Sequence, residues 1–410
     1  MHILHRRTVR IGIAACVAIL VLIANNSSNL FRKTPDLNEV GKLAKDGRFD
    51  LAANLVGDYL SESPDNARAR LIAAELALDQ PKPLPRVALE HLGRVATPNP
   101  GIAAVAKLDE GKAAYMLGLY GRAEICWLRA IRLDPRVPEA AWALLDLYYL
   151  EGRGEEARAL AVNQYKNEPD PHDRVHLLLE LVRQDAEPPQ PSSVAERLTT
   201  VVRPSFRETK AAIALGLALV HDSRPDQGLK TLQRIVERHP NDPVAWDALL
   251  TGLDDSGRAA DLPETLKTVP DSLADEPRLL HHRGKAAQEQ GDRPRALEFY
   301  RRAWKDRPDD FVSAYRLGLL LHATGNPEEA NPVDAWTRSA EAARDAILDL
   351  FRDANAIKDL GTAPHISMYR QLADNRERLG RKPEARAWLA LILEIRPDDA
   401  ASLTSLGRLK

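Results

Sequence analysis

The hydrophobic and polar residues of the stretch 277–310 follow the period of two short amphipathic helices. The first predicted helix covers about 278–289 and the second about 294–305. Gly291 between them can adopt the left-handed backbone conformation that ends a helix, and Pro294 has the fixed φ that suits a first turn. The stretch is therefore predicted to form a helical hairpin.

The same spacing recurs along the chain at an interval of 34 residues. Small or apolar residues mark it in three series: Gly228, Leu262, Ala296 and Ala330; Leu232, Leu266 and Tyr300; Ile235, Val269 and Ala303. Pro240 and Pro308 lie two intervals apart, and neither can continue a helix. A hairpin that recurs with a fixed period buries its apolar face against its neighbours, so the sequence predicts a helical solenoid.

The residues of this repeat resemble the tetratricopeptide repeat. The family pattern has a small residue in the first helix, then alanine, an aromatic residue and alanine along the second helix, and a closing proline. Its counterparts here are Gly284, Ala296, Tyr300, Ala303 and Pro308. The resemblance implies an all-α, right-handed superhelical solenoid of roughly ten hairpins, in which ligands lie along a concave surface made by the first helices.

The phase of the repeat divides the chain. Residues 34–185 are predicted to form an N-terminal array, 186–208 a Pro-rich irregular insertion, and 209–410 a C-terminal array. The insertion either lengthens one turn or separates two sub-arrays, and no helix is expected at its prolines over 186–193.

The C-terminal array loses its phase over 330–365. Pro332 is expected to interrupt the repeat, and 335–358 to form one longer helix. The final stretch, 400–409, is predicted to be the capping helix that a solenoid needs at its end.

Residues 1–33 differ from the rest. A flank containing Arg6, Arg7 and Arg10 precedes an apolar run from Ile11 to Ala24, which is typical of an export signal. The run is short for a membrane span, which favours cleavage, but no small residue stands three positions before a cut near Ala24. We expect a single-pass anchor with the repeats on the exoplasmic or periplasmic side. The alternatives are export after signal cleavage and, because residues 13–16 resemble a lipobox, lipidation of Cys16.

Composition narrows the function. The 57 Lys and Arg residues are balanced by 59 Asp and Glu residues, so the basic excess of a nucleic-acid-binding protein is missing. Aromatic residues make up 5% of the chain, which also argues against stacking on single strands. Two cysteines, Cys16 and Cys126, exclude a disulfide framework and a Cys-rich metal site.

No catalytic motif is present, so we expect no catalytic residue, no cofactor, no metal site and no small-molecule substrate. His281 and His282 are adjacent and are expected to point to different faces of one helix, which makes a shared metal ion difficult. A remote alternative is an enzyme whose site lies in the irregular segment 330–365. Its candidate residues are Asp334, Glu341, Asp345, Asp349 and His365.

The candidate binding site follows from the resemblance, because the exposed inner positions are the second, fifth, sixth, ninth and thirteenth of each repeat. The residues selected there are Arg278, His281, His282, Lys285, Tyr315, Arg316, Arg370 and Gln371. This basic surface would suit an extended peptide with an acidic end. The alternative is that these charges only solvate a helix face.

The sequence therefore predicts a membrane-tethered, non-catalytic scaffold that binds a partner protein or peptide in its groove. An alternative within the same class is an accessory subunit of an export, envelope-assembly, exopolysaccharide or glycosylation system.

Overall fold

The computed structural model describes residues 36–202, 208–357, 360 and 365–409, and its regular elements there are all helical. The predicted all-α solenoid of hairpins is confirmed. The predicted N-terminal hydrophobic helix at 1–33 lies outside the described residues. In the part of the chain that is described, no helix is both long and apolar enough to cross a membrane.

The chain forms two compact units, which divide at Leu117 and Gly118, with residues 132–134 belonging to the first unit. The helices of the first unit are α2 (Leu37–Lys45), α3 (Phe49–Glu62), α4 (Ala67–Asp79), α5 (Pro85–Leu92) and α6 (Pro100–Met116). Helix α7 (Tyr120–Leu133) contains the boundary residues of both units. In the first unit α2 pairs with α3 and α4 with α5, around buried side chains that include Val56 and Leu78.

The second unit continues the hairpins. It contains α8 (Pro138–Leu150), α9 (Gly154–Asn167), α10 (Pro171–Ala186), α11 (Pro191–Thr199), α12 (Thr209–His221), α13 (Pro225–Arg238), α14 (Pro243–Asp255), the short turns η1 (Ala259–Asp261), η2 (Asp271–Leu273) and η3 (Pro277–Leu279), α15 (Leu262–Lys267), α16 (Leu280–Glu289), α17 (Arg293–Asp306), α18 (Phe311–Ala323), α19 (Pro327–Asp345), α20 (Ile347–Ala356), α21 (Ile366–Arg378), α22 (Lys382–Ile395) and α23 (Ala400–Arg408).

Local chemistry sets the register of these hairpins. The Asp242 carboxylate accepts a hydrogen bond from the backbone N–H of Val244 (2.9 Å) at the start of α14, and Asp310 does the same for Val312 (3.1 Å) at the start of α18. The turns inside successive hairpins contain glycines with positive φ at one interval of 34 residues, Gly257, Gly291 and Gly325. Equal starts and equal turns give the repeats equal phase.

The predicted contact between a small residue and an aromatic ring is confirmed. Tyr300 is fully buried, and a Cβ atom added to Gly284 would lie 2.7 Å from its ring. In the preceding hairpin, Gly216 has the same relation to Leu232, at 2.6 Å. The glycines therefore let each second helix approach the first one closely.

The Pro-rich stretch is more helical than expected. Helix α11 begins at Pro191, so the prediction of no helix over 186–193 is wrong at its C-terminal end. Proline is tolerated at the first position of a helix because its missing N–H would have no intrahelical partner there. Ala195 and Leu198 are fully buried, and α11 packs against α12.

The segment around Pro332 also differs from the prediction. Helix α19 continues through Pro332 and ends at Asp345, and α20 starts at Ile347, so the single helix predicted for 335–358 is wrong. Pro332 lies in the second turn of α19, where it removes one backbone hydrogen bond without ending the helix. The predicted terminal helix is confirmed as α23.

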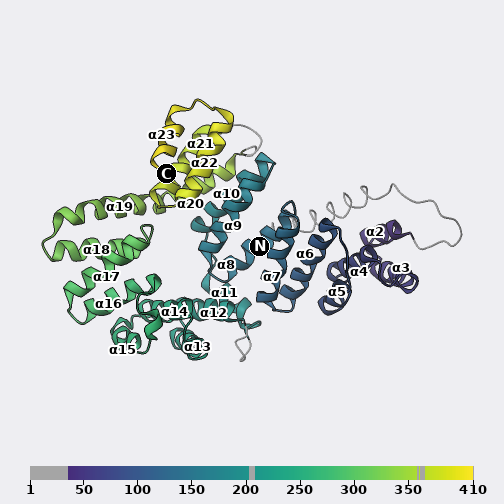
Figure 1. Cartoon of the computed structure of the whole chain (residues 1–410), viewed down its shortest axis with the longest axis horizontal. Coiled ribbons are helices and arrows are strands. Elements are labelled where there is room, and N and C mark those ends of the chain that lie inside the picture. The colour runs from purple at the N-terminus through teal and green to yellow at the C-terminus, as the bar shows by residue number, and fades with distance from the viewer. Residues whose placement is uncertain (1–35, 203–207, 358–359, 361–364, 410) are drawn as a thin grey trace. The chain divides into compact units, whose positions relative to one another are not determined.

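The second unit closes on itself, which the repeat pattern did not predict. Helices α9 and α10 pack against α20 and α22, and Figure 1 shows α10 beside the C-terminal helices. Tyr165 of α9 donates a hydrogen bond from its Oη to the Ala387 carbonyl oxygen (3.0 Å). Leu178 and Val182 of α10 share one hydrophobic core with Trp388. Segments about two hundred residues apart in sequence therefore form one core.

Buried charges accompany this closure. The Asp185 carboxylate accepts hydrogen bonds from Arg158 (2.7 Å) and Arg376 (2.5 Å) and lies 3.4 Å from Arg381. Arg158 also binds Glu384 (2.9 Å), and Arg376 is fully buried. Burial would raise the pKa of Asp185, but Arg158, Arg381 and Arg376 together hold that pKa below its ordinary value. The closure thus depends on a carboxylate that stays ionised.

Candidate binding face on α14, α16 and α18

Three consecutive first helices present equivalent positions of the repeat. The second positions are Val244, Arg278 and Val312, the fifth are Asp247, His281 and Tyr315, and the ninth are Thr251, Lys285 and Leu319. In a helix these positions lie on one face, because they are separated by three or four residues. We call the residues at these nine positions, together with Asp254, His282 and Arg316, the inner face.

The C-terminal end of the inner face is apolar and exposed. Val312, Tyr315 and Leu319 of α18 are 48%, 52% and 56% exposed. Their spacing of three and four residues places them in one stripe along α18. The ring of Tyr315 stacks on that of Phe311, with centroids 6.1 Å apart. Sequence reasoning selected Tyr315 but missed Val312 and Leu319, which the positions two and nine of the repeat would have found.

The basic residues of the inner face are paired with acidic residues of the same face. Arg316 donates a hydrogen bond from Nη2 to Asp254 Oδ2 (2.9 Å), and Lys285 Nζ lies 3.8 Å from Asp254 Oδ1 and 3.4 Å from a carboxylate oxygen of Glu289. Among the described residues, no ion pair of Arg278 is found. The basic charge predicted here is therefore largely balanced by the protein itself.

The two remaining predicted residues lie elsewhere. Arg370 and Gln371 belong to α21, and Arg370 donates a hydrogen bond to Asp399 (2.8 Å), which is the N-cap residue of α23. Gln371 is exposed. The structure thus brings together six of the eight predicted residues, on α16 with its η3 turn and on α18, and places the other two outside the inner face.

The expectation that His281 and His282 diverge is wrong. Their ring centroids are 3.6 Å apart, and His282 Nε2 lies 3.0 Å from Asp247 Oδ1. Burial, followed by the charge of His282, lowers the pKa of His281 to about 4, so its ring is neutral near pH 7. Burial would raise the pKa of Asp247, but His282, His281 and Arg278 lower it overall. Asp247, contributed by the preceding repeat, is what brings the two rings together.

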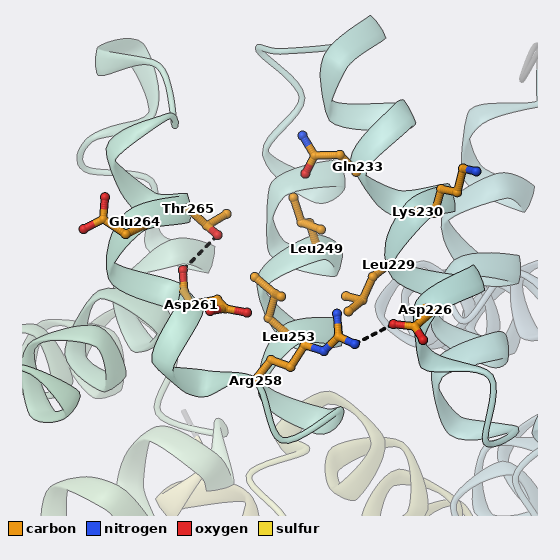
Figure 2. A pocket seen from close by; sticks show the side chains of 10 residues that line it. All are labelled: Asp226, Leu229, Lys230, Gln233, Leu249, Leu253, Arg258, Asp261, Glu264 and Thr265. Atoms are coloured by element: carbon orange, nitrogen blue, oxygen red, sulfur yellow. Dashed lines mark hydrogen bonds and ion pairs between the residues drawn. The ribbon is translucent and has the colours of Figure 1, made fainter.

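A pocket of about 470 Å³ lies beside the shortened helix α15, which has six residues where α13 has fourteen. Figure 2 shows the residues that line it: Asp226, Leu229, Lys230, Gln233, Leu249, Leu253, Arg258, Asp261, Glu264 and Thr265. Three leucines form its apolar part, and an ion pair between Arg258 and Asp226 (2.5 Å) borders it. The pocket is an open indentation that arises because Pro263 and Pro270 flank a short helix.

The acidic residues proposed for a remote enzyme site are dispersed. Asp334 of α19 is paired with His322 of α18 (2.6 Å), and Asp349 of α20 lies 3.7 Å from Arg352. Glu341, Asp345 and Asp349 are all exposed. None of these residues lines the pocket beside α15.

The fold defines the chain as an all-α repeat protein built from helical hairpins. A tetratricopeptide repeat model matches residues 122–341, and a second one matches residues 43–83. The chain belongs to the tetratricopeptide repeat family. No curated protein matches its sequence.

Two solved structures are similar to the chain. The crystal structure of the APC/C hetero-tetramer Cut9-Hcn1 has 14% identity and a TM-score of 0.33, with 99% of this chain and 88% of that chain covered. The human IFIT1 dimer with m7Gppp-AAAA has 14% identity and a TM-score of 0.35, with 93% and 86% covered. At these values neither structure informs the function of this chain.

Proposed function

We propose that this protein is a non-catalytic scaffold whose inner face binds an extended segment of a partner protein. Tetratricopeptide repeats generally bind protein partners, and the repeat match supports that class of function here. The observation that carries the location is the exposed stripe of Val312, Tyr315 and Leu319. An apolar stripe on one helix face is a suitable anchor for apolar side chains of a partner.

The charges beside the stripe define the rest of the partner segment. Arg316 and Lys285 already share Asp254, so an acidic partner residue would have to replace Asp254 as their ion-pair partner. Arg278 is the basic residue that an acidic group can bind without that exchange. We therefore expect apolar side chains at the stripe and one acidic group toward Arg278, which modifies the strongly acidic peptide expected from the sequence.

The proposal includes a membrane tether. The apolar run Ile11–Ala24, with Arg6, Arg7 and Arg10 before it, supports a single-pass anchor with the repeats outside. The tether would hold the partner at the membrane surface and raise its local concentration there.

The test is site-specific photo-crosslinking in native membranes with the full chain as bait. A photo-reactive residue at Leu319 should crosslink a partner, and the double change Val312→Ser and Leu319→Ser should remove that partner from a reversible capture. Leu403 of α23 is 50% exposed and provides the matched control, as crosslinking position and as Leu403→Ser. Equal crosslinking at both positions, or capture that survives the double change, would contradict the proposal.

A further inference from the structure

Asp247, His281 and His282 form a cluster of metal-binding side chains that neither the repeat pattern nor the proposed scaffold requires. Each residue offers one nitrogen or oxygen atom, and these three atoms all lie within 4.8 Å of one another. Asp247 comes from α14 and the histidines from α16, so the cluster joins two consecutive repeats.

The environment of the cluster suits metal coordination. His282 is 2% exposed, and its Nδ1 is a buried atom without a hydrogen-bond partner. His281 and Asp247 are half-buried, so an ion can reach the cluster from the inner face. The neutral ring of His281 keeps a nitrogen lone pair available, and the Asp247 carboxylate is ionised near neutral pH.

The surrounding charges are mixed. Asp310 adds a second negative charge near His281, whereas Arg307 and Arg278 add positive charge near the two half-buried members. Since Asp247 is the only carboxylate that contacts the histidines, the donor set is two nitrogens and one oxygen. Sites with imidazole and one carboxylate suit zinc and similar transition metals better than calcium or magnesium, which prefer oxygen ligands.

We propose that Asp247, His281 and His282 bind one divalent transition-metal ion of the zinc class. Zinc bonds of about 2.0–2.2 Å place tetrahedral donor atoms about 3.3 Å apart. The pair of His282 and Asp247 already has a separation of 3.0 Å, so a rotation of the His281 ring completes the set. Three protein ligands leave a fourth position for water on the inner face. The ion links α14 to α16 and fixes the spacing of two repeats.

A second histidine pair sets the design of the test. His172 and His176 lie one turn apart on α10, with their Nε2 atoms separated by 2.9 Å, and could bind metal on their own. The baseline protein is therefore the full chain with His172→Gln and His176→Gln. It is stripped with chelator and titrated with Co²⁺, followed by visible absorption, and with Zn²⁺, followed by calorimetry.

The baseline protein should bind one ion with a micromolar or lower Kd and give the visible bands of tetrahedral Co²⁺. Adding Asp247→Asn or His281→Gln should weaken binding at least about tenfold and remove those bands. Asp247→Asn is isosteric and keeps an acceptor for His282, so it decides the matter if His281→Gln lowers helicity. A baseline protein that gives no cobalt bands, or an affinity that Asp247→Asn leaves unchanged, would overturn the proposal.

Discussion

The regular repeats from α12 to α18 and the closing contact of α9 and α10 with α20 and α22 solve the same packing problem with different chemistry. The regular repeats join their sequence neighbours through glycines, alanines and one large side chain, as at Gly284 and Tyr300. The closing contact joins distant segments through a shared apolar core and through the buried charges around Asp185. Periodic packing can begin anywhere in the array, whereas the closure needs one particular pair of surfaces.

The difference predicts that the closure is the more sensitive of the two regions to the loss of one charge. Asp185→Asn would leave Arg158, Arg376 and Arg381 with Glu384 as their remaining carboxylate, and breaking a buried ion pair costs about 3–5 kcal/mol. The expected result is a lower urea midpoint, measured by circular dichroism at neutral pH.

The control for that change is Glu329→Gln, which removes an exposed carboxylate bonded to Arg301 in the regular repeats. Exposed ion pairs contribute no more than about 1 kcal/mol, so its midpoint should stay near that of the wild type. Because the folded-state pKa of Asp185 is lowered, its stabilisation is present above about pH 4 and is lost as the pH falls further. The gap between Asp185→Asn and the wild type should therefore narrow on acidification; a constant gap would mean that the carboxylate charge is not the cause.

The regular repeats should instead be most sensitive to added volume. A Cβ atom at Gly228 would lie 2.5 Å from the Gly216 carbonyl oxygen and 2.9 Å from the Val220 backbone nitrogen. Backbone atoms cannot rotate away, so α12 and α13 would have to separate. Overpacking of this kind costs about 1–3 kcal/mol. Gly228→Ala should lower the urea midpoint accordingly.

Gly407→Ala is the matched control, because no atom lies within 4 Å of the added Cβ in α23. It should not destabilise the protein, since alanine is favoured over glycine in a helix. Equal stability of both variants would show that α12 and α13 are not held at the distance seen here.

The repeat period predicted much of this regular region and little of the closure. It located the turn at Gly291, the contact of Gly284 with Tyr300, and the helices that carry the inner face, because these features depend on residues within one or two repeats. Position 228 shows a limit of the same reasoning: Leu262 occupies the equivalent position of the next repeat, so the pattern alone does not show that glycine is required.

The features that the sequence did not predict depend on contacts between distant residues. Arg316 appeared to be a free base because its partner Asp254 is 62 residues away, and Asp185 meets Arg376 across 191 residues. His281 and His282 face one carboxylate because α14 places Asp247 between them, which side-chain direction along one helix could not indicate. Helix α11 was missed for a local reason, since Pro191 can begin a helix as well as prevent one.

The smallest predicted effect concerns the turn of the hairpin that begins the regular repeats. Gly257, Gly291 and Gly325 have positive φ values of 75°, 77° and 76° at intervals of 34 residues, and the position one interval earlier is Ser223, with a φ of 60°. A left-handed backbone costs a residue with a Cβ atom about 1 kcal/mol relative to glycine. Ser223→Gly should raise the urea midpoint by that amount, less the entropy that glycine adds to the unfolded chain.

The reverse change, Gly257→Ser, isolates the backbone term, because no atom lies within 4 Å of a Cβ added at Gly257. It should lower stability by a similar amount, so the two variants should shift the midpoint in opposite directions. A shift in the same direction would mean that the turns of these two repeats are not equivalent. The contrast with Asp185 would then lie less in regular against irregular packing than in how many distant residues each position contacts.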